Sequence, residues 1–230
     1  GNMPTNASLS YTSPGFYSTV TLEHIEGRQD QFGSCGAISH DGQARFLAHL
    51  RHVKEYFGYS GAFHVRSRNN FPMGCGLASS ASSFAALTSA ACKAISDILG
   101  VDFPTATERA SLSRLGSGSS CRSFFSPWCI WEDNHVKVVN LPFSVETHWV
   151  AVVSEKHKAI GSSDAHQRVR SSPLFPGYSV MPSKFETKRH NGDFVHHFPS
   201  CSVIAKLPIL LIRNVSSIGS AASAGCLGKG

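Results

Sequence analysis

The sequence predicts a fold that mixes β-strands with α-helices, and three observations support this expectation. Short stretches rich in Ser, Thr, Tyr and Val come first, which is typical of strands. Apolar residues at helical spacing then cover residues 43–57, and a second run at the same spacing begins at Ser80. The chain has 230 residues, of which 41% are hydrophobic, so it is long enough to bury a core.

The elements follow in order along the chain. Pro14-Gly15 and Gly27 break the first residues into short strands or hairpins. The later strands are expected where apolar residues alternate with polar ones, or where a nearly all-apolar run suits a central strand. The expected strands are 8–12, 18–23, 62–68, 129–131, 136–139 and 148–153. The expected helices are 43–57, stopped near Gly58; 80–99, ended by Gly100; and 105–115.

Charge and cysteine content narrow the class of protein. The net charge of +6 and the pI near 9.0 suit phosphorylated ligands. Lys and Arg are scattered, however, so no nucleic-acid partner is expected. The seven cysteines form no C-x-x-C pair, which favours reduced thiols inside a cell. Residues 1–10 lack a signal-peptide pattern, and the apolar run 204–212 is too short to cross a bilayer. We expect a soluble cytoplasmic protein without a membrane partner.

The stretch from Asn69 to Ser83 is the strongest candidate for a phosphate site. It reads as a strand, a glycine turn with Gly74 and Gly76, and a helix start rich in serine. Free backbone N–H groups and the positive end of the helix dipole meet at such a point, and both attract phosphate. The spacing matches neither G-x-x-x-x-G-K-[ST] nor G-x-G-x-x-G. The alternative is an ordinary helix start, with Ser79 or Ser80 as the cap.

Two further loops carry hydroxyl groups. In 116–123 the guanidinium of Arg122 can form two parallel hydrogen bonds with a phosphate, and Ser117, Ser119 and Ser120 can donate beside it. The alternative is a flexible turn whose arginine caps a neighbouring helix. The third loop, 161–167, is rich in Ser and Asp, and its alternative is a plain turn.

Four motifs in order resemble those of the mevalonate diphosphate decarboxylases, members of the small-molecule (GHMP-type) kinase superfamily. The resemblance spans roughly residues 1–177. The first motif resembles the family's early strand, the second its phosphate loop and the third its second signature. The fourth, a glycine-serine turn followed by Ser-Ser-Pro-Leu-Phe, resembles its third signature. The motifs occupy 4–10, 69–82, 116–123, and 161–163 with 171–175.

The resemblance implies a fold and a division of the chain. The fold would be α+β, with a two-layer N-terminal lobe and a second α+β lobe. Residues 1–150 would form the lobe that binds nucleotide and substrate, 151–177 would begin the C-terminal lobe, and 178–230 would be an atypical tail. We expect that tail to replace the second lobe, through truncation or a shifted reading frame, and to pack poorly. A homodimer is expected from the family.

The resemblance also implies an activity and site residues. The family uses ATP and Mg²⁺ to phosphorylate mevalonate 5-diphosphate, which then loses phosphate and carbon dioxide to give isopentenyl diphosphate. The residues carried over fall into two groups and include no metal ligand. ATP phosphates would lie at Gly76, Leu77, Ala78, Ser79, Ser80 and Ser82. The substrate would lie at Ser117, Gly118, Ser119, Arg122, Ser162 and Ser163, with Arg122 also in the catalytic role.

The sequence departs from the family pattern at several points. Ser120 stands where the family usually has alanine, and Asp164 where it usually has threonine. The family's Lys-Tyr-Trp-Gly-Lys segment, and its Asp-Ala-Gly-Pro-Asn motif with the aspartate that orients or deprotonates the hydroxyl, do not occur in these 230 residues. His190, His196, His197 and Cys201 match no standard zinc spacing. The alternatives to a decarboxylase are a nucleotide-binding fragment without turnover and a related small-molecule kinase.

Overall fold

The structure is a computed structural model, and it describes most of the first 141 residues. The described residues are 7–13, 15–33, 38–71, 78–132, 134–141, 168 and 171–173, together with the backbone of four short strands beyond residue 185. The expected strand at 148–153 and the third loop at 161–167 lie outside them.

Strands come first and last in the chain, and the helices lie between β3 and β5. The strands are β1 (Ser8–Thr12), β2 (Ser18–Ile25), β3 (Gln31–Phe32), β4 (Ala62–Asn69), β5 (Trp128–Glu132), β6 (His135–Val138), β7 (Glu186–His190), β8 (Asp193–His197), β9 (Ser202–Lys206) and β10 (Arg213–Asn214). The helices are α1 (His40–Tyr56), α2 (Ser79–Leu99), α3 (Ala106–Ser113) and the 3-10 helix η1 (Gly118–Phe124).

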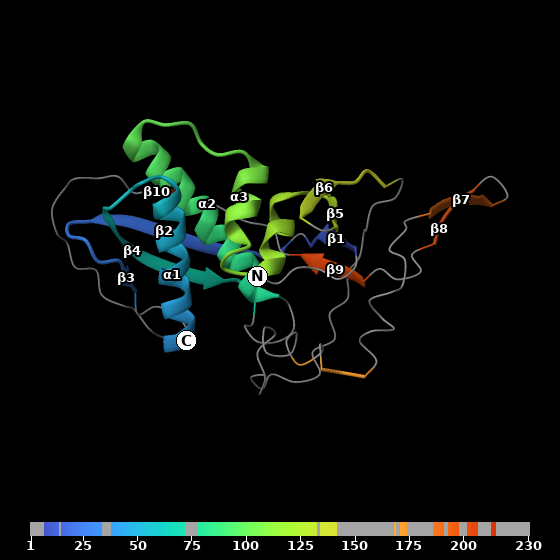
Figure 1. The fold of residues 1–230 in the computed structure, drawn as a ribbon, viewed down its shortest axis with the longest axis horizontal. Coiled ribbons are helices and arrows are strands. Elements are labelled where there is room, and N and C mark those ends of the chain that lie inside the picture. The colour runs from blue at the N-terminus through green and yellow to red at the C-terminus, as the bar shows by residue number, and fades with distance from the viewer. Residues whose placement is uncertain are drawn as a thin grey trace.

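The strands form two sheets and a separate hairpin. One sheet has the order β6-β5-β1-β9 and the other β10-β2-β4-β3, while β7 and β8 pair with each other. β2 and β4 are antiparallel over their whole length, from Ser18 opposite Asn69 to Ile25 opposite Ala62. Figure 1 shows α1, α2 and α3 beside the β2-β4 sheet, with the other sheet further along the molecule. The α+β class and the two-layer lobe are therefore confirmed.

The main core lies between the β2-β4 sheet and helices α1 and α2. Alternate residues of the strands face the helices, as the period of two requires. α2 is buried along most of its length because its sequence is largely Ala and Ser, which allow close packing on both neighbours. The core residues include Val20, Leu22, Phe46, Leu50, Val53, Phe63, Val65, Phe84, Leu87, Ala91 and Ile95.

The helix boundaries follow local capping chemistry. α1 begins three residues before the expected 43, because Ser39 caps it by accepting a hydrogen bond from the N–H of Gly42 at 3.2 Å. α3 begins at a capping box, in which Thr105 and Glu108 bond to each other's backbone N–H. Gly100 ends α2 in the left-handed conformation, as predicted. Among the helices of the described part, none is both long and apolar enough to cross a membrane.

Candidate functional site

The start of α2 lacks the usual side-chain cap. Its N-cap is Ala78, a left-handed residue with φ of 53° and ψ of 37°, and within the described residues no side chain caps the helix. The first turn contains no acidic residue. The interpretation of Ser79 or Ser80 as an ordinary cap is therefore wrong. A left-handed alanine costs roughly 1–2 kcal/mol, so the neighbouring structure must impose it.

Three side chains fix this helix start against the sheet. The side-chain oxygen Oδ1 of Asn69, at the end of β4, accepts hydrogen bonds from the hydroxyls of Ser18 at 2.6 Å and Ser83 at 3.1 Å. The hydroxyls of Ser18 and Ser83 are themselves 3.3 Å apart. Next in the chain, Asn70 accepts from the N–H of Tyr17 and donates to the carbonyl of Gly15, both at 2.7 Å. The start of α2 is thus tied to both β2 and β4.

Ser82 differs from its neighbours because its hydroxyl is buried without a partner. The residue is 1% exposed, and its Oγ has no hydrogen bond within the described structure. A buried hydroxyl normally finds a partner, since leaving one unpaired costs about 1–3 kcal/mol. Ser79 is half-buried and Ser80 exposed, so both can reach a ligand from solvent. The helix start therefore combines accessible serine hydroxyls with one buried hydroxyl that has no partner in the described structure.

The second candidate loop is a regular 3-10 helix rather than a flexible turn. Arg122 in η1 is only 6% exposed. Its Nη1 donates to the hydroxyls of Ser8 at 3.3 Å and Ser10 at 3.2 Å, both on β1. The guanidinium carbon lies 5.5 Å from the centre of the Trp131 ring, a cation–π distance. Arg122 therefore joins η1 to both β1 and β5, which differs from the alternative of a flexible turn whose arginine caps a neighbouring helix.

Ser120, the departure from the family's usual alanine, is fully buried and satisfied. Its Oγ lies 2.7 Å from the hydroxyl of Ser113 and 2.6 Å from the carbonyl oxygen of Ser117. The Ser113 hydroxyl donates in turn to the carbonyl of Ala110 at 2.9 Å. The extra hydroxyl is accommodated because it ties η1 to the end of α3. Ser117, Gly118 and Ser119 remain half-buried at the front of η1.

Gly116 brings the two candidate segments together. A Cβ on this residue would overlap the ring of Phe84, in the second turn of α2, and would lie 2.8 Å from Cγ of His49. The carbonyl of Gly116 accepts from Arg45 at 3.5 Å. The close approach requires glycine. The segment 116–124 thus lies directly against α2, and Figure 1 shows the yellow-green helix η1 between α2 and the sheet that contains β1 and β5.

His49 supports this contact from α1 as a neutral side chain. Its Nε2 lies 2.8 Å from the hydroxyl of Thr88, which itself donates to the carbonyl of Phe84. The Thr88 oxygen therefore accepts, so Nε2 carries the proton. Burial, and to a smaller degree the nearby His52, lowers the pKa of His49 to about 4. The imidazole is consequently uncharged at neutral pH.

The thiols around the site are structural. Cys92, Cys121 and Cys129 are buried and form no disulfide. Burial raises the pKa of Cys92 to about 12 and that of Cys121 to about 11, although Arg122 acts in the opposite direction on Cys121. A thiol that stays protonated is a poor nucleophile. Cys92 and Cys121 therefore contribute to packing rather than to reactivity.

Some of the expected site residues fall outside the description. Gly76, Leu77, Ser162 and Ser163 are among them, as is Asp164. Of the residues that are described, the sequence interpretation overlooked Ser18 and Ser83, whose pairing with Asn69 links positions far apart in the chain. No group of three His, Cys, Asp or Glu side chains able to hold a metal occurs among the described residues.

Comparison with known proteins identifies the family. The model of the diphosphomevalonate decarboxylase-like N-terminal domain matches residues 1–138, which is more than half of the chain. The chain belongs to the diphosphomevalonate decarboxylase family. The diphosphomevalonate decarboxylase of Saccharomyces cerevisiae is 32% identical over 218 residues, covering 82% of this chain and 53% of that protein.

Solved structures of the diphosphomevalonate decarboxylase family share this fold. The mevalonate diphosphate decarboxylase of Legionella pneumophila is 45% identical, with a TM-score of 0.72, over 78% of this chain and 59% of that one. Another chain, solved in complex with MVAPP, AMPPCP and magnesium, is 24% identical with a TM-score of 0.59 over 76% and 56%, and shows a shared fold. The present chain spans about half the length of the curated relatives it matches.

Proposed function

We propose that the chain takes part in the ATP-dependent decarboxylation of mevalonate 5-diphosphate to isopentenyl diphosphate. ATP phosphates would bind at the start of α2, and the substrate would bind along the front of η1. The observation that carries the proposal is the uncapped start of α2, with the Ser82 hydroxyl buried and unpartnered behind it. Membership of the diphosphomevalonate decarboxylase family supplies the reaction.

The start of α2 fits the triphosphate of ATP. Its free N–H groups and the positive end of the helix dipole favour phosphate oxygens, and no acidic residue in the first turn opposes them. Ser79 and Ser80 can donate from the exposed side, while Ser82 would gain the partner it lacks. We assign Gly76 and Leu77 to the same phosphate loop.

The front of η1 would hold the diphosphate or carboxylate of the substrate. The partly accessible residues there are Ser117, Gly118 and Ser119. The buried guanidinium of Arg122, in the same 3-10 helix, supplies positive charge. Because Arg122 is already fixed by Ser8 and Ser10, its charge needs no rearrangement when the substrate binds. Ser162 and Ser163 would complete the diphosphate pocket.

The reaction requires the protein chiefly to position the two reactants and to stabilise the charge that develops. Phosphorylation of the tertiary hydroxyl makes a leaving group, and its departure with carbon dioxide forms the double bond. Holding the two polyphosphates close together in the reactive orientation supplies much of the rate enhancement. Mg²⁺ would neutralise phosphate charge and would arrive with the nucleotide, since it commonly retains waters and binds through phosphates. Arg122 would stabilise the developing negative charge.

Two measurements on this chain test the proposal. Calorimetry with the ATP analogue AMPPCP should show binding that Ser82→Ala weakens about fivefold, as expected for one lost hydrogen bond. A coupled assay should show carbon dioxide released in step with ADP when mevalonate 5-diphosphate is supplied. Absence of AMPPCP binding would overturn the assignment of the phosphate site.

The second candidate is a nucleotide-binding chain without turnover. It is favoured by one observation, the lack of an Asp-Ala-Gly-Pro-Asn motif in these 230 residues. AMPPCP binding without ADP or carbon dioxide would select this candidate. ADP with a phosphorylated product and no carbon dioxide would instead indicate a kinase. The homodimer and the cytoplasmic location expected from the sequence remain predictions. Analytical ultracentrifugation would test whether the chain forms a homodimer.

A further inference from the structure

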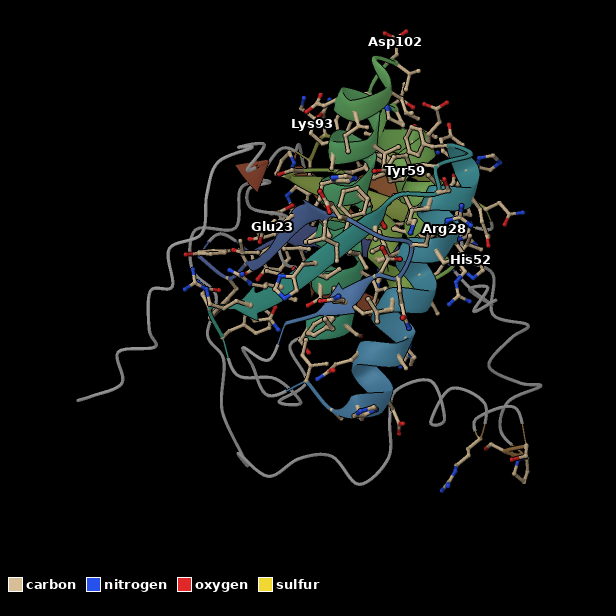
Figure 2. All side chains as sticks on the ribbon, turned by 90° about the vertical axis from the view of Figure 1, so that its left-hand side faces the viewer. Glu23, Arg28, His52, Tyr59, Lys93 and Asp102 are labelled. Carbon is tan, nitrogen blue, oxygen red and sulfur yellow. The ribbon has the colours of Figure 1, made fainter. Side chains whose placement is uncertain are left out.

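A cavity of about 350 Å³ lies at the opposite end of β2 and β4 from the candidate site. The register shows this separation: Ser18 pairs with Asn69 at the site, whereas Ile25 pairs with Ala62 at the far end. The turn after β2, the last turns of α1 and the loop before β4 line the cavity. Figure 2 faces this end of the molecule and labels Arg28, His52 and Tyr59 on it.

The half-buried carboxylate of this cavity, that of Asp30, is already fully paired. Both oxygens of Asp30 accept from Nζ of Lys54, at 3.1 and 2.9 Å, and Oδ1 also accepts from the N–H of Phe63 at 2.9 Å. Glu55 lies 3.2 Å from the Nδ1 atom of His52. The last carbonyls of α1, those of Lys54 and Glu55, accept from the N–H groups of residues 57–59.

Several donors of the cavity face solvent, because Arg28, Arg51 and Ser60 are exposed. Arg28 and Arg51 form no hydrogen bond or ion pair within the described part of the chain, and the hydroxyls of Tyr59 and Ser60 have no partner there. Burial and the charge of Asp30 raise the pKa of Tyr59, so its phenol keeps its proton. Lys54 and Asp30 neutralise each other. The two arginines then outweigh Glu55 by one positive charge.

One wall of the cavity is apolar. Leu47 lines it from α1, and the ring of Tyr59 is held in place by Phe63, with ring centres 5.5 Å apart. The surplus positive charge of the lining favours an anionic ligand, and the guanidinium group of each arginine matches the planar or tetrahedral oxygens of an acid group. The volume is at the lower end of the range for small-molecule sites.

We propose that this cavity binds a small organic anion, with its phosphate or carboxylate group between Arg28 and Arg51 and its apolar body against Leu47 and Tyr59. The site is independent of the phosphate loop at the start of α2. Its ligand would join the turn after β2 to the end of α1, two segments that bound the sheet edge far from η1.

The test uses the whole chain and three aromatic probes of similar size: phenyl phosphate, benzoate and the neutral benzyl alcohol. Amide NMR shifts at Tyr59 and Ser60 report on the cavity, and shifts at residues 79–83 report separately on the phosphate loop. We expect saturable shifts at Tyr59 and Ser60 with one of the two anions, and none with benzyl alcohol. The stronger anion identifies the acid group as phosphate or carboxylate.

Matched single-residue variants test how much each arginine contributes to anion binding. Arg28→Gln and Arg51→Gln should each weaken anion binding at the cavity about tenfold, as expected for lost charge-assisted hydrogen bonds. Arg68→Gln removes the same charge from an exposed position of β4 outside the cavity and should leave the affinity unchanged. Non-saturable shifts, equal binding of benzyl alcohol, or equal losses in all three variants would overturn the proposal.

Discussion

Ser82 at the start of α2 and Ser120 in η1 are both buried serines of the candidate site, but their hydroxyls are in opposite situations. Ser82 has no partner within the described structure, whereas Ser120 lies within hydrogen-bonding distance of Ser113 and Ser117. Within the described residues, Ser82 is therefore left with an unused hydroxyl, whereas Ser120 uses its hydroxyl to hold η1 against the end of α3. Under the proposed function, the Ser82 hydroxyl would contact ATP directly, while Ser120 would support the neighbouring residues of η1 that contact the substrate.

Acidification should cause the largest loss of stability, because it protonates His49, the buried side chain that supports the contact between residues 116–124 and α2. His49 has a pKa of about 4 when folded, against 6.5 when exposed. The unfolded chain therefore binds a proton first, so stability is complete above pH 6.5 and is lost as the pH falls from there through 4. The loss should reach about 3 kcal/mol below pH 4.

Urea unfolding at several pH values measures this loss. His49→Gln should remove most of the slope between pH 6.5 and 4, while His52→Gln, on an exposed neighbour, should keep it. An unchanged slope in His49→Gln would show that other groups govern the acid response.

Gly116→Ala should be the most damaging substitution in the segment 116–124. The new methyl group would overlap the ring of Phe84, which is buried between Phe46 and His49 and cannot swing away. We expect the free energy of unfolding to fall by about 2–3 kcal/mol, the usual range for overpacking. Gly58→Ala is the control, because that glycine has φ of +63° but open space around it. Its backbone strain alone should cost about 1 kcal/mol, so equal losses would refute the packing argument.

Arg122→Lys tests whether η1 contributes a correctly oriented positive charge to substrate binding. Lysine keeps the charge but lacks the planar guanidinium group, whose Nη1 atom donates to both Ser8 and Ser10. The affinity for mevalonate 5-diphosphate, measured by calorimetry, should fall about tenfold. Arg114→Lys is a matched control, since both guanidinium groups lie over Trp131, at 5.4 Å for Arg114 and 5.5 Å for Arg122. A similar loss in both variants would mean that the Trp131 contact, rather than the substrate, explains the effect.

The two serines provide the most direct comparison and the smallest expected effects. Ser120→Ala should lower the free energy of unfolding by about 1 kcal/mol, the net value of a buried hydrogen bond. Ser82→Ala removes a buried hydroxyl that has no partner within the described structure, so it should not lower the free energy of unfolding and should raise it by about 1 kcal/mol. Thermal unfolding of both variants without ligand measures these two changes in stability. A loss of stability in Ser82→Ala would show that its hydroxyl already has a partner in the free chain.

Local patterns predicted most of the fold, while the details of the site depend on distant contacts. The periodicity of 43–57 and the apolar run from Ser80 placed α1 and α2 within three residues, because helix period and caps are local properties. The two-residue strand β3 and the helical form of η1 were not foreseen, since each is too short to show a period. Three features stayed hidden for another reason: the left-handed Ala78, the unpaired Ser82 and the burial of Arg122 against β1 each depend on tertiary neighbours.

The bonds from Arg122 to Ser8 and Ser10 have a consequence for the order in which the protein forms during synthesis. β1 pairs with β5 from Ser8 opposite Trp131 to Tyr11 opposite Trp128, so the first strand leaves the ribosome more than a hundred residues before its partner. The buried residues of the main core, from β2, β4, α1 and α2, all lie between Val20 and Ile95. We expect this central unit to fold first and β1 to wait unpaired, which is the period when a nascent chain is most exposed to misassociation.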